Sequence, residues 1–201
     1  MSRLNLPGAR RLRIIASVLT LTLPPIAVGQ TASAGHLEPP TAPVAALPVA
    51  LYTAQANLQE ASDSSKSGLA TEILLGRLGE QLGPQLLPAG QVAAAAASPE
   101  ARALSGDQPC NVIVACARLA GKTTGARWVV MAKVSKTSNL IWLFTGQLIR
   151  VATGEIVLDD STELKGDPDT MVRVGTRIFA DRVARVVRNG GVATNFPAAG
   201  S

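Results

Sequence analysis

Three neighbouring segments in the second half of the chain most constrain what it can fold into. They are 126–136 (ARWVVMAKVSK), 140–151 (LIWLFTGQLIRV) and 155–164 (EIVLDDSTEL), all rich in β-branched and other apolar side chains. This composition favours β-strands, and consecutive strands joined by short turns pair in antiparallel fashion. The sequence therefore predicts a three-stranded antiparallel meander.

The turns between these strands predict the register. A three-residue first turn pairs Lys136 with Leu140, and a three-residue second turn pairs Val151 with Glu155. Both turns end on an asparagine or a glycine, as hairpins of this length prefer. The register gathers nine apolar side chains on one face, which we expect to be core: Trp128, Val130, Ala132, Val134, Trp142, Phe144, Leu148, Ile156 and Leu158. A slip of one residue would scatter that set.

The opposite face of the meander mixes apolar with polar side chains. Its apolar residues are Val129, Met131, Ile141, Leu143, Ile149 and Val157. Antiparallel sheets usually present polar residues on the face that meets water, and apolar patches there often mark interfaces. We predict a partner surface on this face. A helix of the same chain, a second copy and another protein are the three possible covers.

The segments on either side of the meander complete the predicted fold. They are a first strand at 47–55, a helix at 67–82, a short strand at 85–88, an Ala-rich helical stretch at 90–104 that breaks at Ser98-Pro99, and a helix over 111–120. Together they predict an α+β fold of the α/β sandwich type, with helices packed on a mixed sheet that ends in the meander. We expect one domain over residues 47–189.

The last predicted element is an amphipathic helix. Asp167 is its N-cap and Pro168 its first residue, and Asn189-Gly190 ends it. One side carries Met171, Val174, Ile178, Val183, Val186 and Val187. The other side carries arginines and an Asp181–Arg185 pair. We expect that basic side to be a solvated face, with docking of an acidic partner as the alternative.

Residues 1–34 have the pattern of a secretory signal peptide. Four arginines precede a short apolar run, and Ala32-Ser33-Ala34 is a cleavage site that would leave Gly35 as the new N-terminus; a cut after Gly29 is the alternative. We expect a flexible Pro- and Ala-rich leader at 35–46 and a flexible tail at 190–201. The chain is therefore predicted to be periplasmic, with no stable membrane anchor after cleavage.

The charge of the mature chain argues against nucleic acid as a partner. The net charge of the whole chain is +5, but removal of the four leader arginines leaves 15 Lys and Arg against 14 Asp and Glu. Aromatic residues make up only 3% of the chain, so platforms for base stacking are few. Neither a basic field nor stacking surfaces are therefore predicted.

The side chains that enzymes and metal sites need are scarce. The one histidine, His36, lies in the predicted leader, and Cys110 and Cys116 alone fall short of a zinc site. Gly121-Lys122-Thr123 ends like a phosphate-binding loop, but residue 116 is not the required glycine and a strand follows where a helix should. We interpret Gly121 as a helix C-cap. No enzyme activity, cofactor or metal is predicted.

The two cysteines leave three alternatives open. In an oxidising compartment Cys110 and Cys116 are expected to form a disulfide, provided that Cys110 precedes the helix and the chain folds back. Two free thiols or a redox-active pair are the alternatives, although redox pairs prefer a two-residue spacing.

The order of these elements resembles a family of short exported bacterial proteins of unknown function. The resemblance covers residues 46–189, is most specific over Gly125–Ile141 (GARWVVMAKVSKTSNLI), and includes TGEIV and the Arg-rich terminal helix. It implies a fold like the amino-terminal α/β domain of TolB and the core of CsgG. It brings no established activity. Family members encoded beside periplasmic quinoprotein dehydrogenases imply an accessory role.

These observations predict an exported, non-catalytic periplasmic accessory module that binds a protein partner, self-associates or assists assembly. The alternative is a small-molecule or metal carrier that serves a periplasmic oxidoreductase of the quinoprotein dehydrogenase type. A deep pocket with polar groups would favour the carrier, and a flat apolar patch would favour the accessory module.

Overall fold

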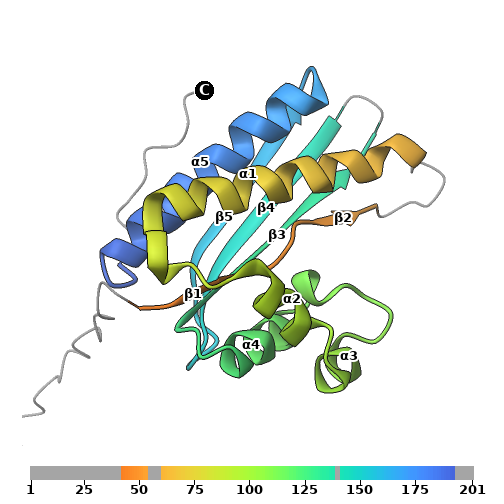
Figure 1. Ribbon diagram of the computed structural model, residues 1–201. Helices are drawn as coiled ribbons and strands as arrows, with labels where there is room; N and C mark the ends of the chain where they lie inside the picture. The colour runs from red at the N-terminus through yellow and green to blue at the C-terminus, as the bar shows by residue number, and fades with distance from the viewer. Residues whose placement is uncertain (1–41, 54–59, 139–140, 193–201) are drawn as a thin grey trace, which may run out of the picture. The chain divides into compact units, whose positions relative to one another are not determined.

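The computed structural model describes residues 42–53, 60–138 and 141–192 (Figure 1). The predicted signal peptide, its cleavage site after Ala34, His36 and residues 193–201 lie outside these ranges. The fold includes residues that we expected in the flexible leader, because Ala42 is buried and 44–46 form a strand. Gly190, expected in the tail, is buried too. The domain therefore extends beyond 47–189 at both ends.

Five strands form one mixed sheet. They are β1 (Val44–Ala46), β2 (Ala50–Tyr52), β3 (Trp128–Lys136), β4 (Ile141–Arg150) and β5 (Ile156–Lys165). Strands β3, β4 and β5 are the predicted meander, whereas β1 and β2 both lie parallel to β3. Of the predicted first strand at 47–55, only β2 is a strand in the described residues, and β1 precedes that range. The pairing register shifts by one residue between them, around Pro48, which cannot donate a backbone hydrogen bond.

Helices and short 3₁₀ segments connect the strands. They are η2 (Ala61–Asp63), α1 (Ser64–Leu82), η3 (Gly83–Gln85), α2 (Ala89–Ala96), α3 (Pro99–Ser105), η4 (Cys110–Val112), α4 (Val114–Thr123) and α5 (Pro168–Arg188). The predicted break falls between α2 and α3, where the Ser98 hydroxyl accepts a hydrogen bond from the amide of Ala101 at 3.2 Å. The predicted short strand at 85–88 is wrong: Leu86 forms only an isolated bridge to Val44.

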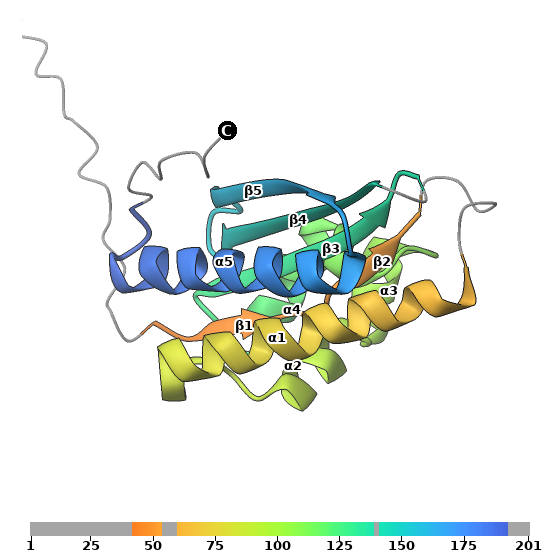
Figure 2. The same ribbon diagram turned by 90° about the horizontal axis from the view of Figure 1, so that it is seen from above.

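The sheet lies between two helical layers. Helices α1 and α5 lie side by side on one face, while α2 and α4 pack on the other and α3 packs against α4 (Figures 1 and 2). The first layer buries Leu74 and Leu78 of α1 and Phe179 of α5 against the sheet. The second layer is smaller and encloses a separate apolar core. This is the predicted α+β architecture.

The meander differs from the predicted register at both turns. Lys136 pairs with Trp142 instead of Leu140, which is a shift of two residues. Because the difference is two residues, every side chain of β3 and β4 stays on its predicted face. At the second turn Arg150 pairs with Glu155 through a backbone hydrogen bond of 2.9 Å. A β-bulge between Leu148 and Ile149 then restores the predicted pairing for the rest of β5.

The terminal helix α5 begins as predicted, with the Asp167 carboxylate accepting a hydrogen bond from the amide of Thr170 at 2.8 Å. Interactions with the side chain of Thr170 and then with its backbone amide lower the pKa of Asp167. The predicted apolar side is wrong for two residues, because Val174 and Ile178 are 47% and 40% exposed. The buried arc instead passes through small and polar residues, among them Gly175, Thr176, Ala180 and Ala184. A reading of hydrophobicity alone could not place it there.

The Gly121-Lys122-Thr123 motif lies in the last turn of α4. The helix runs to Thr123, so the predicted cap at Gly121 is wrong; the residue with positive φ is Gly125, at 73°. Gly121 is buried instead, and a Cβ there would lie 2.7 Å from a methyl carbon of Val151. The glycine thus allows α4 to lie close to the sheet.

Candidate binding surface on the half-covered face of the sheet

Helices α2 and α4 cover only the part of the second sheet face that adjoins β1. There Val129, Met131 and Ile149 are 0%, 6% and 0% exposed, in a core that includes Val92 of α2 and Ala117 of α4. The cover is part of the chain itself, which is one of the three covers expected. For these three residues the predicted partner surface is therefore wrong.

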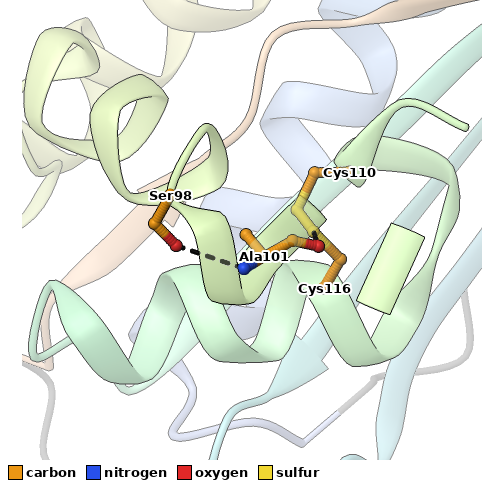
Figure 3. The surroundings of a disulfide bond; sticks show 4 residues. All are labelled: Ser98, Ala101, Cys110 and Cys116. Carbon is orange, nitrogen blue, oxygen red and sulfur yellow. Dashed lines mark hydrogen bonds between the residues drawn. A yellow bond between two sulfur atoms is a disulfide. The ribbon is translucent and has the colours of Figure 1, made fainter. Parts of the chain in front are cut away.

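A disulfide joins the two segments at the edge of this cover. Cys110 lies in η4 and Cys116 in α4, and their Cα atoms are 5.2 Å apart (Figure 3). The chain folds back before the helix, as the disulfide prediction required. The Sγ atom of Cys116 also lies 3.3 Å from the carbonyl oxygen of Ala101 in α3. Since a disulfide sulfur carries no proton, this is a packing contact that brings α3 against α4.

Hydrogen bonds to loop carbonyls hold the helical cover on the sheet. The side-chain nitrogen Nδ2 of Asn111, between the two cysteines, donates to the carbonyl oxygen of Pro48 in the β1–β2 connection. At the other end, the guanidinium of Arg118 in α4 donates to the carbonyl oxygens of Val151 and Ala152, at 3.2 and 3.1 Å. The cover is thus tied to the sheet at both ends, and the sheet beyond it stays open.

A recess of about 250 Å³ marks the boundary between the covered and open parts of this face. We call it the boundary recess. It is lined by Asn111, Val112, Val114, Met131, Ala132, Lys133, Thr145 and Gln147. Its apolar residues come from both the cover and the sheet, and the polar side chains of Lys133, Thr145 and Gln147 come from the sheet. The recess can therefore hold a small group that needs both apolar contact and hydrogen bonds.

Beyond the recess, the sheet presents a surface that we call the open half-face. By the pairing register, it consists of Tyr52, Lys133, Ile141, Leu143, Thr145, Gln147, Asp159, Ser161 and Glu163. Ile141 and Leu143 are half-buried on β4, and neither belongs to the core clusters found in the described part of the chain. On β5, Asp159 and Glu163 are exposed beside them.

One edge of the open half-face is basic and aromatic. Tyr52 of β2 is 39% exposed, and the Nζ atom of Lys133 lies 5.0 Å from the centre of its ring. An ammonium at this distance over an aromatic face is a cation–π contact. The half-face thus has apolar side chains at its centre, a cation on one side and carboxylates on the other.

The β-bulge changes the faces of two residues on β5. Val157, predicted on the partner surface, packs against the core under α1 and α5 instead, so the prediction is wrong for it. Ile156, predicted in that core, pairs with Ile149 and is 43% exposed. The extra residue of a bulge turns one side chain to the other face. Of the six predicted residues, Ile141 and Leu143 alone lie on the open half-face.

Sequence reasoning missed Tyr52 as a member of this surface. Tyr52 reaches the half-face because β2 lies parallel to β3 and pairs Tyr52 with Ser135. Parallel partners are far apart in sequence, and no local pattern indicates which residues they bring together. The Ile156 exposure was missed for a different reason, because a bulge leaves no clear trace in the alternation of side chains.

The described residues offer few groups for catalysis or metal binding. Within residues 42–53, 60–138 and 141–192, no cluster of three His, Cys, Asp or Glu side chains could hold a metal ion. Asp159 and Asp160 point to opposite faces, and Asp160 accepts a hydrogen bond from the Nη1 atom of Arg182 at 2.6 Å. In the same part of the chain, no helix is both long and apolar enough to cross a membrane.

The chain is similar to several solved structures of low sequence identity. The C-terminal domain of LpoB from Salmonella enterica is 19% identical, with a TM-score of 0.44, over 63% of this chain and 84% of that one. A PelC dodecamer from Paraburkholderia phytofirmans is 14% identical, with a TM-score of 0.42, over 77% of this chain and 91% of that one. TolB from Acinetobacter baumannii is 16% identical, with a TM-score of 0.40, over 77% of this chain and 30% of that one.

No curated protein matches this chain. A family model does match, over residues 44–183, which covers both helical layers and all but the last five residues of α5. This agrees with the resemblance seen over residues 46–189 of the sequence. The chain therefore belongs to the family DUF3280, described as "Protein of unknown function (DUF2380)".

Proposed function

We propose that this chain is an exported, non-catalytic accessory protein of the periplasm that binds a protein partner through the open half-face. The observation that carries the proposal is the position of Ile141 and Leu143. Both are half-buried, and neither joins a core cluster of the described residues. Apolar side chains at the centre of a sheet face, with charged residues around them, are typical of an interface.

The proposal is tested by Leu143→Asp, with Leu104→Asp as a matched control. Leu104 is 49% exposed on α3, away from the sheet. Both variants should fold, because neither position lies in a core cluster. A photo-crosslinking residue at position 143 should give a defined adduct in cells, and one at position 104 should not.

Two outcomes would contradict this function. If Leu143→Asp unfolds while Leu104→Asp does not, the half-face is core and no partner surface. If position 143 gives the same crosslinks as position 104, no partner docks there. Light scattering of the purified chain, before and after the Leu143→Asp change, distinguishes self-association from binding of another protein.

Export is tested separately. The intact mass of protein recovered from the periplasm should correspond to a chain that begins at Gly35. A species that still begins at Met1 would contradict both the export and the periplasmic setting of the partner.

The boundary recess favours a second candidate, a carrier of a small molecule for a periplasmic oxidoreductase. Its volume of about 250 Å³ and its mixed lining suit a small polar ligand. Native mass spectrometry of the chain purified from its host should then detect a bound molecule. Val112→Trp should abolish that signal by filling the recess, whereas Leu143→Asp should leave it unchanged. No bound mass in the unaltered chain would exclude the carrier.

A further inference from the structure

The outer side of α5 carries apolar side chains that are exposed in the part of the chain that the structure describes. Val174 and Ile178 lie four residues apart, so they are neighbours on one side of the helix. They are 47% and 40% exposed, although the helix packs its opposite side into the core. They belong to neither the open half-face nor the boundary recess, which lie on the other face of the sheet.

These side chains line an open recess of about 440 Å³. We call its lining the α5 groove: Thr170, Arg173, Val174, Arg177, Ile178 and Asp181. A second recess, of about 380 Å³, adjoins it at Arg177 and extends over α1, past Ile73 and Gly76. Helices α1 and α5 lie side by side (Figure 2). The second recess therefore lies at the seam between them, and the first lies next to it on α5.

Within the described residues, the charges around the α5 groove leave two cations without a carboxylate partner. The carboxylates nearby are already bound: Asp181 accepts from Arg77 at 2.6 Å, and Asp169 pairs with Lys66 at 2.5 Å. Glu80 also accepts from Arg77, at 2.8 Å. These two hydrogen bonds raise the pKa of Arg77.

Arg173 and Arg177, by contrast, are exposed and have no carboxylate partner among the described residues. Like charges four residues apart on a helix repel each other. A carboxylate placed between the two guanidinium groups would remove that repulsion and accept hydrogen bonds from both. The groove therefore combines an apolar stripe with a cationic one, each at helical spacing.

We propose that the α5 groove binds an acidic segment of a partner protein. Apolar side chains of the segment pack on Val174 and Ile178, and its carboxylates pair with Arg173 and Arg177. A bilayer surface fits the groove less well. It would bring anionic head groups toward Asp169, Asp181 and Glu80, and the groove lacks the aromatic side chains that anchor interfacial helices.

The test uses a defined peptide as the probe. A fluorescein-labelled amphipathic peptide of about 16 residues, with Glu on one side and Leu on the other, is long enough for several helical turns. Its Lys-for-Glu counterpart is the charge control. Fluorescence anisotropy should give saturable binding of the Glu peptide to the full chain, weakened by added salt, and no binding of the Lys peptide.

Two double variants test the charges with the same net change. Arg173→Glu/Arg177→Glu should weaken binding by about tenfold or more, because like charges then face each other across the interface. Arg102→Glu/Lys122→Glu alters exposed residues of α3 and α4 on the other side of the sheet and should change binding by less than about twofold. Circular dichroism should show both variants folded.

A third variant, Val174→Ser/Ile178→Ser, tests the apolar stripe. It should weaken binding by about tenfold and leave the salt dependence unchanged, since it removes apolar contact without altering charge. Equal binding of the Glu and Lys peptides, or equal effects of the two charge variants, would overturn the proposal. So would binding to phosphatidylglycerol vesicles without binding to the Glu peptide, because the groove would then be a lipid contact.

Discussion

Lys136 and Asp63 form an ion pair in the interior, although 73 positions separate them in the sequence. The Nζ atom of Lys136 lies 3.1 Å from Oδ2 of Asp63, and the two side chains are only 3% and 5% exposed. A second carboxylate, of Glu60, lies 2.9 Å from the same nitrogen at the surface. The pair joins the end of β3 to the first turn that precedes α1, and so fixes where α1 begins over the sheet.

Breaking this pair from one side should destabilise the fold. Lys136→Met leaves the Asp63 carboxylate buried, and among the described residues its remaining hydrogen-bond donor is the backbone amide of Glu60, at 2.8 Å. We expect the Tm to fall by roughly 5–10 °C, because an unpaired buried charge is costly. Thermal unfolding of Lys136→Met, Asp63→Ala and the double variant gives the interaction free energy between the two side chains. A double variant as destabilised as the sum of the single variants would show that the pair contributes nothing.

The same pair predicts a loss of stability at high pH. The hydrogen bond to Glu60, followed by that to Asp63, raises the pKa of Lys136 above its ordinary value of 10.5. A raised pKa in the folded state stabilises the fold as long as the lysine is charged in both states. That contribution is complete below about pH 10.5 and disappears as the pH rises through the folded value. Urea unfolding at about pH 8 and about pH 11 should show the loss in the native chain. The Lys136→Met variant should lack this component, and an identical pH response would contradict the assignment.

The sequence predicted the meander well because its information is local. Alternation with a period of two decides the face of each residue, and an error of two residues at the first turn leaves every face unchanged. Val130, Val134 and Phe144 are therefore buried where the sequence placed them. The error at the second turn was a single residue. Because of this error, Ile156 and Val157 lie on the faces opposite to those predicted. After the bulge, the rest of β5 has the predicted register.

The extent of the helical cover could not be predicted from sequence. Val129 and Leu143 lie on the same face of the meander, yet Val129 is buried by α2 and α4 and Leu143 lies outside their reach. The difference depends on the length of α4 and on its anchoring by the disulfide and by Asn111. These are contacts between distant segments. The exposure of Val174 is a similar case, because Gly175 and Ala180 let α1 and the sheet bury the neighbouring arc of α5 instead.

Gly146 and Gly76 should respond in opposite ways to substitution by alanine. A Cβ at Gly146 of β4 would lie 2.5 Å from the ring of Phe179, which packs on this strand from α5. Gly146→Ala should therefore cost about 1–3 kcal/mol of stability through overpacking. At Gly76 of α1 no atom lies within 4 Å of the added carbon. Gly76→Ala should stabilise by about 0.5–1 kcal/mol, because alanine favours the helix. Chemical denaturation measures both, and a neutral Gly146→Ala would contradict the close contact.

The disulfide should stabilise the helical cover without being needed for the fold. The bridge closes a small loop, because Cys110 and Cys116 are only six positions apart in the sequence. In the chain-entropy account such a loop contributes about 2 kcal/mol. Cys110→Ser/Cys116→Ser should therefore lower the free energy of unfolding by that amount, seen as a lower urea midpoint, and keep the circular dichroism spectrum. Dithiothreitol should lower the midpoint of the native chain equally and leave the double variant unchanged. Because Asn111 lies between the two cysteines, proteolysis near it should become faster in the variant.

If a thiol reagent modifies both cysteines of the folded, unreduced protein from the periplasm, the bridge is absent, and the cover must be held by Asn111 and Arg118 alone.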